Sequence, residues 1–349
     1  MNSDTYATPV LAWYDAHRRR LPWRAEPGQA VDPYVVWLSE IMLQQTTVAT
    51  VQPRFAAFLA RWSTVSDLAA ASLDQVLVEW QGLGYYARAR NLHRCAEVVH
   101  NEYGGRFPME VDQLRQLPGI GAYTAKAIAA IAFNQPVLPV DTNVERIVSR
   151  LFAIDAPLPG GKALIAARAA GLADPHRPGD FAQALMDLGA STCQPRQPAC
   201  HNCPLEVVCQ AAAVGPELFP VRAAKRPRPL RTGTVFWLEN PHGEVLLRRR
   251  PDSGLLGGMT EFPSTAWEER ANANVEQLAA AAPLPSEWTA TAGQVDHTFT
   301  HFQLTLRVVR GVSQADPPAD AFWVHPDAFA DHALPTVMKK VARHVLAQP

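Results

Sequence analysis

The sequence has almost no net charge, no long apolar run and very few cysteines outside one cluster. Its 349 residues carry a formal net charge of −1, whereas proteins that wrap nucleic acid non-specifically are usually basic. The longest apolar run, residues 127–133, is far shorter than a membrane span. The amino terminus also lacks the apolar core of a secretion signal. We therefore expect a soluble, cytoplasmic protein, in which only local patches could meet a polyanion.

The cysteines that are present lie close together. Cys193, Cys200, Cys203 and Cys209 are separated by six, two and five residues, and Cys95 is the only other cysteine. Two metal sites compete: a structural zinc site, usually built from two C-x-x-C pairs, and a 4Fe-4S cluster bound by four thiolates of one loop. The single C-x-x-C favours the cluster. Disulfides are the remaining alternative, but we expect no signal peptide, and the chain is long enough not to need disulfides.

The spacing of apolar residues divides the chain into a helical part and a mixed part. From residue 9 to about 212, apolar residues recur every three or four positions, which indicates an all-α region. Residues 216–232 are rich in Pro, Arg and Lys, which indicates a basic linker. Residues 233–349 are predicted to form a separate, smaller α+β domain. Its pattern predicts a hairpin, a half-buried strand and a terminal helix at 234–249, 302–308 and 335–346.

One helix of the first part illustrates the pattern. It is predicted to begin after Ser39, as its cap, and to run to Trp62 with an apolar stripe of period near 3.5. Glu40, Gln44 and Thr47 then share a separate, polar face. The helix therefore offers polar side chains to a ligand or to solvent.

A helix-hairpin-helix signature, Leu-Pro-Gly-Ile-Gly, stands at residues 117–121 between a helix starting at 111 and a helical run over 122–133. Glycines let the backbone turn tightly and point amide groups outward at a helix start, where the dipole favours a phosphate. Such a hairpin binds DNA through its backbone without reading bases. We expect Gly119 and Gly121 to contact DNA phosphates, together with the basic residues Arg88 and Arg90. A second basic group, Arg-Arg-Arg, lies at 18–20.

Together these motifs closely resemble the endonuclease III superfamily of DNA glycosylases, and within it the MutY-type enzymes that act on adenine. The resemblance spans nearly the whole chain. Besides the hairpin and the cysteines it rests on LPWR, WLSEIMLQQT, QGLGYYARARNLH and VDTNVERI, at 21–24, 37–46, 81–93 and 140–147. It implies a multidomain, monomeric protein with a glycosylase region over 1–215. Within this region it implies a helical barrel domain over 31–136 and a cluster domain made of 8–30 and 137–215.

The resemblance also assigns two carboxylates to the reaction. Breaking the N-glycosidic bond of adenine requires an acid that protonates the base and an anion that stabilises an oxocarbenium-like sugar. The matching residues are Glu40 as the acid and Asp141 as the anion. Glu40 then needs a raised pKa, whereas Asp141 must stay ionised. Tyr123 matches a tyrosine that hydrogen-bonds near the aspartate and Asn143 a residue that helps to place it, although many family members have Gly where Thr142 stands.

The lysine of the bifunctional relatives is missing. In the endonuclease III branch a lysine after G-x-G-x forms a Schiff base with the sugar and cleaves the strand. Tyr123 stands at that position here, and Lys126 is three residues further on. We therefore expect a monofunctional glycosylase that leaves an abasic site. The alternatives are an endonuclease III-like glycosylase and lyase, and a non-catalytic iron-sulfur protein that binds DNA and senses redox state.

Extrusion of the adenine requires side chains that fill the gap and a pocket that receives the base. The resemblance implies that Gln45 and Tyr85 wedge into the duplex. It also implies that Trp23, Arg24 and Gln183 line the adenine pocket. Whether the cluster is structural or redox-active stays open.

The last domain resembles the Nudix-like domain that ends MutY-type proteins, through LRRRPDSGLLGGMTEFP and DHTFTHFQL. It lacks the R-E-x-x-E-E metal box of Nudix hydrolases, so we expect it to bind rather than hydrolyse. Family members recognise 8-oxoguanine with a Phe-Ser-His loop, here Phe299, Thr300 and His301. Thr300 keeps the hydroxyl of the serine and adds a methyl group. The implied partner is double-stranded DNA with adenine opposite 8-oxoguanine, or opposite guanine, and the implied location is cytoplasmic, at the nucleoid if the source is bacterial.

Overall fold

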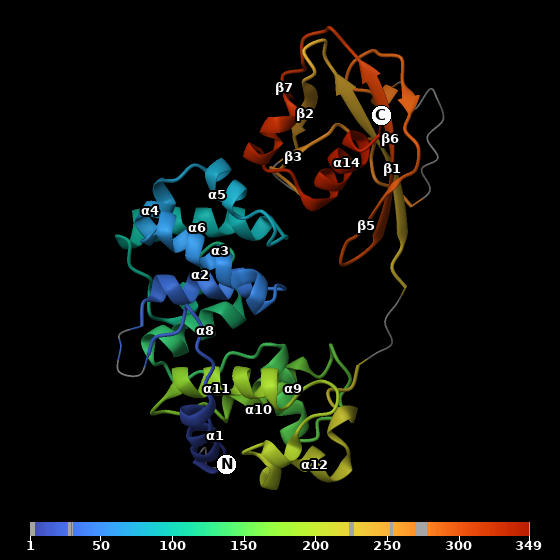
Figure 1. The fold of residues 1–349 in the computed structure, drawn as a ribbon. Helices are drawn as coiled ribbons and strands as arrows, with labels where there is room; N and C mark the ends of the chain where they lie inside the picture. Colours follow the sequence, from blue (N-terminus) through green and yellow to red (C-terminus); the bar gives the residue numbers. More distant parts are fainter. Residues whose placement is uncertain are drawn as a thin grey trace. The chain divides into compact units, whose positions relative to one another are not determined.

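The computed structural model describes residues 4–26, 29, 31–222, 227–251, 254–269, 278 and 280–348. The chain divides into two compact units (Figure 1). The first consists of Met1–Ala70 and Asn91–Lys225, and the second of Ala71–Arg90 and Arg226–Pro349. No helix in the described ranges is long and apolar enough to cross a membrane. The finer division of 1–215 into a barrel domain and a cluster domain stays a prediction.

The first unit is helical, as the apolar spacing predicts. Its α-helices are α1 (Asp4–His17), α2 (Pro33–Leu43), α3 (Val48–Arg61), α4 (Val65–Ala70), α6 (Ala87–Tyr103), α7 (Val111–Leu114), α8 (Ala122–Phe133), α9 (Thr142–Leu151), α10 (Lys162–Ala170), α11 (Pro178–Ser191) and α12 (Gln210–Val214). Short 3-10 helices near the cysteines are η1 (Cys200–Asn202), η2 (Glu206–Val208) and η3 (Pro216–Leu218). The first residues of α6, up to Arg90, belong to the second unit.

The prediction of one helix from Ser39 to Trp62 is wrong, because two helices occupy this stretch. Helix α2 starts earlier, after Asp32, whose carboxylate accepts a hydrogen bond from the Tyr34 backbone N–H at 2.9 Å. Ser39 therefore lies inside α2 and does not cap it. The apolar stripe continues in phase across the break, so the spacing alone does not reveal the end of α2.

The break between α2 and α3 is a turn at Gln45, whose φ is +55°. Only a few per cent of residues other than glycine adopt this left-handed conformation. Thr47 then caps α3, with its hydroxyl accepting a hydrogen bond from the Thr50 backbone N–H at 3.4 Å. The turn places the end of α2 and the start of α3 beside one another.

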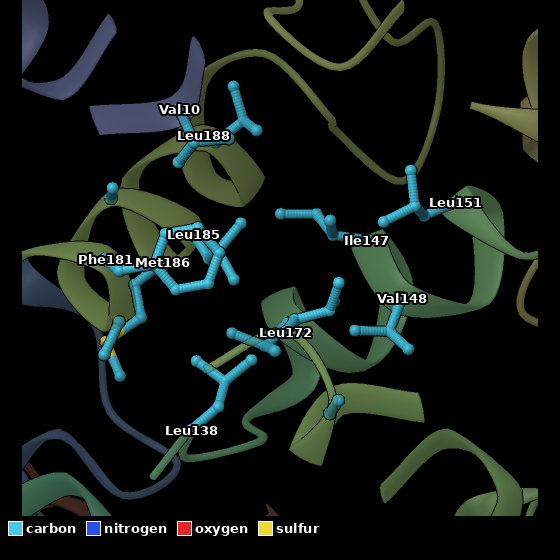
Figure 2. Close-up of a cluster of buried hydrophobic side chains, with 14 of the residues drawn as sticks. Val10, Leu138, Ile147, Val148, Leu151, Leu172, Phe181, Leu185, Met186 and Leu188 are labelled. Carbon is cyan, nitrogen blue, oxygen red and sulfur yellow. The ribbon is translucent and has the colours of Figure 1, made fainter. Parts of the chain in front are cut away.

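Helix α11 is the centre of the first unit and packs against α1, α8 and α9. Figure 2 shows Phe181 and Leu185 of α11 in the buried cluster that also contains Ile147 of α9. A glycine brings these helices together, because a Cβ at Gly189 would lie 2.6 Å from the Cβ of Asn143. This close approach positions the N-terminus of α9, which follows Asp141. Helix α8 also packs against α2.

The predicted hairpin is present between α7 and α8, and α8 has the predicted bounds. Gly119 has a φ of +75°, and a Cβ there would lie 2.7 Å from the Cβ of Asn91. Both the conformation and the close approach therefore require glycine at this position. Gly121 is the cap of α8 and has an extended conformation with open space around its Cα. Its backbone is thus accessible to a ligand.

The second unit contains a mixed sheet of seven strands, together with α5 (Leu73–Glu79), η4 (Pro326–Asp331) and α14 (Thr336–Leu346). The strands are β1 (Leu230–Glu239), β2 (Val245–Arg249), β3 (Thr260–Glu261), β4 (Thr289–Ala290), β5 (Val295–Thr298), β6 (Gln303–Val312) and β7 (Ala321–Val324). The order is β3-β2-β1-β6-β4, with β5 paired to β6 and β7 paired to β2. Strands β1 and β6 are parallel, whereas the other pairs are antiparallel.

The predicted α+β character is confirmed by this sheet. The hairpin of β1 and β2, strand β6 and helix α14 all lie where the sequence pattern places them. Helix α14 contributes Val337, Met338 and Val341 to a buried cluster with Trp237 and Phe262 of the sheet region. The second unit therefore has a core of its own.

Candidate active site

The first unit contains a cavity of about 980 Å³. Its wall includes residues before α2, the turn between α2 and α3, the hairpin before α8, the start of α9 and one face of α11. Ten of the predicted site residues line it: Trp23, Arg24, Glu40, Gln45, Gly119, Gly121, Tyr123, Asp141, Asn143 and Gln183. Gln44 and Thr47 also line the cavity, so the predicted polar face exists although the helix is broken.

Glu40 lies in α2 with only 8% of its surface exposed. Its carboxylate accepts a hydrogen bond from the hydroxyl of Tyr123. Burial raises the pKa of Glu40 to about 7, with the Asp141 charge adding to the rise and the tyrosine and Arg24 opposing it. A carboxyl group that titrates near neutral pH is suited to act as a general acid.

Asp141 has more polar surroundings than Glu40. It caps α9, with Oδ1 accepting from the Val144 backbone N–H at 2.7 Å and Oδ2 from the Asn143 side-chain amide at 3.1 Å. Burial raises the pKa of Asp141, but these hydrogen bonds and the Arg146 guanidinium oppose the rise. The donors and the helix N-terminus favour the charged form. One cavity thus holds two carboxylates in different environments.

Asp187 of α11 is not among the residues that line the cavity, but it binds Arg24, which is, and the sequence pattern does not single it out. Its side chain is 1% exposed and accepts hydrogen bonds from Arg24 Nη1 and Nη2 at 2.6 and 2.8 Å. It also accepts from the backbone N–H and Nε of Arg19, at 3.0 and 2.5 Å. Although burial raises the pKa of Asp187, these partners hold it below its usual value. The loop before α2 is therefore anchored to α11. The one signal in the sequence is an aspartate among apolar residues of a predicted helix.

Two other predicted pocket residues make packing contacts. Trp23 is 7% exposed, and its ring forms an edge-to-face contact with Phe55, with centroids 5.4 Å apart. Gln183 donates from its side-chain amide to the Gly179 carbonyl at 3.2 Å. Both still contribute to the cavity wall.

The two predicted wedge residues share an unusual backbone conformation. Gln45 in the first unit and Tyr85 in the second have φ values of +55° and +48°, and both side chains are exposed. Left-handed residues other than glycine carry strain, which is often retained at functional sites. Within the second unit, the Tyr85 hydroxyl hydrogen-bonds to the Thr300 hydroxyl.

The predicted phosphate contacts Arg88 and Arg90 are engaged within the second unit. Arg88 donates to the Leu83 and Gly84 carbonyls at 2.8 and 3.1 Å, and its guanidinium lies 5.2 Å from the ring centre of Trp80. Burial lowers its pKa to about 10. Arg90 donates to the Gly257 carbonyl. These guanidinium groups therefore stabilise the protein, and their role in phosphate binding stays a prediction.

The four clustered cysteines line one small cavity in the first unit, together with Arg150. Burial, and then the neighbouring thiols, raise the pKa of Cys203 to about 11, so a thiolate here needs a cationic partner. Arg150 Nη1 donates to Cys193 Sγ at 3.2 Å. Within the described ranges, no three His, Cys, Asp or Glu side chains converge as ligands of one metal ion. A metal centre bound by thiolates would supply that positive charge, and these four cysteines would hold it.

Helix α9 connects the cysteine loop with Asp141. Arg146 donates from Nε to the Cys193 carbonyl at 2.7 Å and from Nη2 to Asn143 Oδ1 at 2.9 Å. Asn143 in turn donates to Asp141. The position of the carboxylate is thus tied to the position of the loop.

Family models match both units of the chain. Residues 38–164 match the model described as HhH-GPD superfamily base excision DNA repair protein. Residues 234–344 match the model described as NUDIX domain. The helical region with its hairpin and the mixed sheet are the corresponding parts of the structure.

Solved structures similar to this chain include that of a thermostable thymine-DNA glycosylase, with a TM-score of 0.54 and 28% identity. The match covers 61% of this chain and 97% of that one. A trapped endonuclease III–DNA covalent intermediate matches with a TM-score of 0.50 and 20% identity, over 61% of this chain and 98% of that one. At that identity it supports the fold alone.

Curated relatives match over nearly the full length. Adenine DNA glycosylase of Homo sapiens is 37% identical over 398 residues, covering 96% of this chain and 72% of that protein. The enzyme of the same name from Schizosaccharomyces pombe is 30% identical over 397 residues, covering 92% and 85%. The chain belongs to the adenine DNA glycosylase family, and it is a base excision repair glycosylase that acts on adenine.

Proposed function

We propose that this glycosylase hydrolyses the N-glycosidic bond of adenine paired with 8-oxoguanine or guanine, with Glu40 as the general acid and Asp141 as the stabilising anion. One observation carries the assignment. Glu40 and Asp141 line the same cavity, yet burial brings the pKa of Glu40 to about 7 while hydrogen-bond donors surround Asp141. Two carboxyl groups with different environments can serve as acid and anion in one reaction.

The reaction breaks the bond between adenine and C1′ of the sugar, and the bonding electrons leave with the base. Glu40 gives its proton to the adenine, which makes the base a better leaving group. Positive charge develops on the sugar, where the Asp141 carboxylate stabilises it. Water then adds to C1′ and loses a proton, which leaves a hydroxyl group and an abasic site.

The proposal includes hydrolysis without strand cleavage. A lyase would need an amine that attacks the sugar. Tyr123 occupies the expected position of that lysine and donates its hydrogen bond to Glu40. Among the described residues that line the cavity there is no lysine, and Lys126 is therefore not part of its wall.

Trp23, Arg24 and Gln183 are proposed to receive the extruded adenine, because they line the cavity beside Glu40. Gln45 and Tyr85 are proposed to fill the space that the base leaves in the duplex. Their exposed side chains on left-handed backbone support this role. The extrusion costs a few kcal/mol, which contacts of this kind offset.

Cys193, Cys200, Cys203 and Cys209 are proposed to bind a 4Fe-4S cluster, since they line one cavity and come from one loop with a single C-x-x-C. Such a cluster links the loop by four bonds and can exchange an electron. Arg150 would then donate a hydrogen bond to the ligating sulfur of Cys193. Iron and sulfide analysis of the purified protein, with zinc measured in the same sample, tests the assignment.

The turn with Phe299, Thr300 and His301 is proposed to contact the 8-oxoguanine. Thr300 and His301 are exposed, and the Thr300 hydroxyl can donate or accept a hydrogen bond. We further propose that the protein acts as a monomer in the cytoplasm. Gel filtration with light scattering tests the oligomeric state.

A single-turnover assay tests the proposed reaction. The parent protein is incubated with duplexes carrying one adenine opposite 8-oxoguanine, guanine or thymine, and the strands are separated with and without alkali. The proposal predicts breaks mainly after alkali, and a faster reaction opposite 8-oxoguanine. Breaks without alkali would support a glycosylase and lyase. Tight binding without abasic sites would support a DNA-binding sensor.

A further inference from the structure

The exposed turn that carries Thr300 is fixed by Phe299. The Phe299 backbone N–H donates to the Phe302 carbonyl at 2.9 Å, which closes the turn. The two rings stack with centroids 4.7 Å apart and planes at 30°. Phe299 is half-buried, whereas Thr300 and His301 are exposed. The phenylalanine therefore anchors the turn, and the next two residues are the ones that face solvent.

Trp267 supports this anchor from a different part of the chain. Its ring lies 5.9 Å from the Phe299 ring, at an angle of 31°. It also lies directly against β1, because a Cβ at Gly233 would be 2.7 Å from Trp267 Cδ1. The indole Nε1 is buried, and no described residue accepts a hydrogen bond from it. The tryptophan thus contributes the shape and area of its ring rather than a hydrogen bond.

Arg250 orients Trp267 from a third direction. Its guanidinium lies 5.2 Å from the centre of the indole ring, a cation–π contact. The same guanidinium hydrogen-bonds to Glu261 and donates from Nε to the Leu255 carbonyl at 3.1 Å. Glu261 is buried, and its other carboxylate oxygen accepts a hydrogen bond from Arg248 Nε at 2.8 Å. Because a buried ion pair fixes the arginine, the arginine fixes the ring.

We propose that Trp267, oriented by Arg250, is a positioning residue for the turn 299–301 and sets the preference for adenine opposite 8-oxoguanine over adenine opposite guanine. The inference rests on the proposed function of this turn. Trp267 acts through Phe299 and does not itself have to touch the lesion. Without the indole the Phe299 ring loses one wall, and the turn must then be ordered when the lesion binds, which reduces affinity. Adenine opposite guanine does not make this contact with the turn. The affinity for that substrate should therefore fall less.

The test compares Trp267→Leu and Arg250→Lys with the parent. Lysine keeps the charge beside Glu261 but lacks the planar fork that stacks on the indole. Arg310→Lys is the matched control, because Arg310 pairs with Glu239 at the other end of β6. Dissociation constants and single-turnover rate constants are measured for both duplexes. We expect the preference for 8-oxoguanine to fall about tenfold in Trp267→Leu, equivalent to about 1.4 kcal/mol. A smaller fall is expected in Arg250→Lys, and no change in the control.

Thermal unfolding separates a lost contact from a lost fold. If Trp267→Leu unfolds at a markedly lower temperature, Trp267→Phe and Arg250→Lys carry the test instead. If the parent prefers adenine opposite 8-oxoguanine and the variants keep this preference in full, the inference on Trp267 is overturned, but the proposed function is not. Equal losses on both duplexes would also overturn it, because they indicate general support of the fold. A parent without any preference would overturn the proposed lesion recognition, and the inference with it.

Discussion

Each unit of the molecule contains a buried glutamate, and the two glutamates have different partners. In the first unit Glu40 is 8% exposed and accepts a hydrogen bond from the neutral hydroxyl of Tyr123. In the second unit Glu261 is 1% exposed and is ion-paired with Arg248 and Arg250. Burial raises the pKa of Glu40, whereas Glu261 is buried as part of a network of ion pairs.

This difference separates the proposed general acid from a structural carboxylate. A carboxyl group held near neutrality can give up its proton at physiological pH, as glycosidic bond cleavage requires. The Glu261 carboxylate, ion-paired with two guanidinium groups, instead fixes the segments that carry those arginines. Burial alone therefore does not identify a catalytic acid. The hydrogen-bond and ion-pair partners of the buried carboxyl group are needed as well.

The largest expected effect comes from removing the proposed acid, Glu40. Glu40→Gln keeps the size of the side chain but cannot donate a proton of suitable acidity, so the single-turnover rate should fall by on the order of 100- to 10,000-fold. DNA binding should persist, because the amide still fills the same space. Rate constants and dissociation constants on the same duplex measure both quantities. A loss below about fivefold would show that another group protonates the base.

Removing the buried glutamate of the second unit should affect stability instead. Glu261→Gln leaves Arg248 and Arg250 without their counter-charge, and breaking a buried ion pair costs about 3–5 kcal/mol. Denaturant unfolding of the variant, followed by tryptophan fluorescence, measures the loss. The rate on adenine opposite guanine should stay close to that of the parent at temperatures where both are folded. A stable variant with a greatly reduced rate would reverse the assignment of the two glutamates.

The raised pKa of Glu40 should reduce stability at alkaline pH. In the folded state the pKa of Glu40 is raised from 4.5 to about 7, so binding of the proton stabilises the folded protein. This stabilisation is fully present below pH 4.5. That contribution is lost as the pH rises through about 7. At about 1.36 kcal/mol for each tenfold change in proton affinity, the loss is roughly 3 kcal/mol as an upper limit. Glu40→Gln should therefore be more stable than the parent at pH 8, and the difference should shrink below pH 5. Parallel pH dependences of the two proteins would contradict the assignment.

The same group should set the alkaline limb of the rate. An acid must be protonated to act, so the single-turnover rate should fall above a pH of about 7, by about tenfold for each further pH unit. On the acidic side the rate should fall as Asp141 takes up a proton, because its stabilising negative charge is then lost. A pH profile on adenine opposite 8-oxoguanine measures both limbs. A rate that rises steadily through pH 8 would exclude Glu40 as the acid.

Much of this organisation was predictable from local sequence. The bounds of α8, the hairpin of β1 and β2 and the cysteine loop follow from residue types at fixed spacing, and the structure contains them. The end of α2 was not predictable, because the apolar stripe continues through the left-handed turn at Gln45. The role of Trp267 was equally hidden, since its partners Gly233 and Phe299 are distant in the chain. Features of this kind depend on tertiary contacts, which the periodicity of apolar residues does not reveal.

Asp187 is the other contact that local sequence did not reveal, and it provides the last prediction. Its carboxylate balances the charge of Arg24, which lies near Glu40 and lowers the pKa of that group. In Asp187→Asn the size is kept but the balancing charge is lost. Arg24 should then lower the pKa of Glu40 further. The effects of Tyr123 and Asp141 on that pKa should stay the same.

The alkaline limb of the rate should therefore move to lower pH in Asp187→Asn, and the rate at pH 7.5 should fall by about tenfold if the proton affinity of Glu40 falls by the same factor. The control is Asp180→Asn on the same helix, whose partner Arg177 has a 40% exposed side chain. An exposed pair of this kind contributes about 0–1 kcal/mol, so its pH profile should match that of the parent. If Asp187→Asn lowers the rate equally at every pH, the aspartate supports the cavity wall alone, and the acidity of Glu40 is set without it.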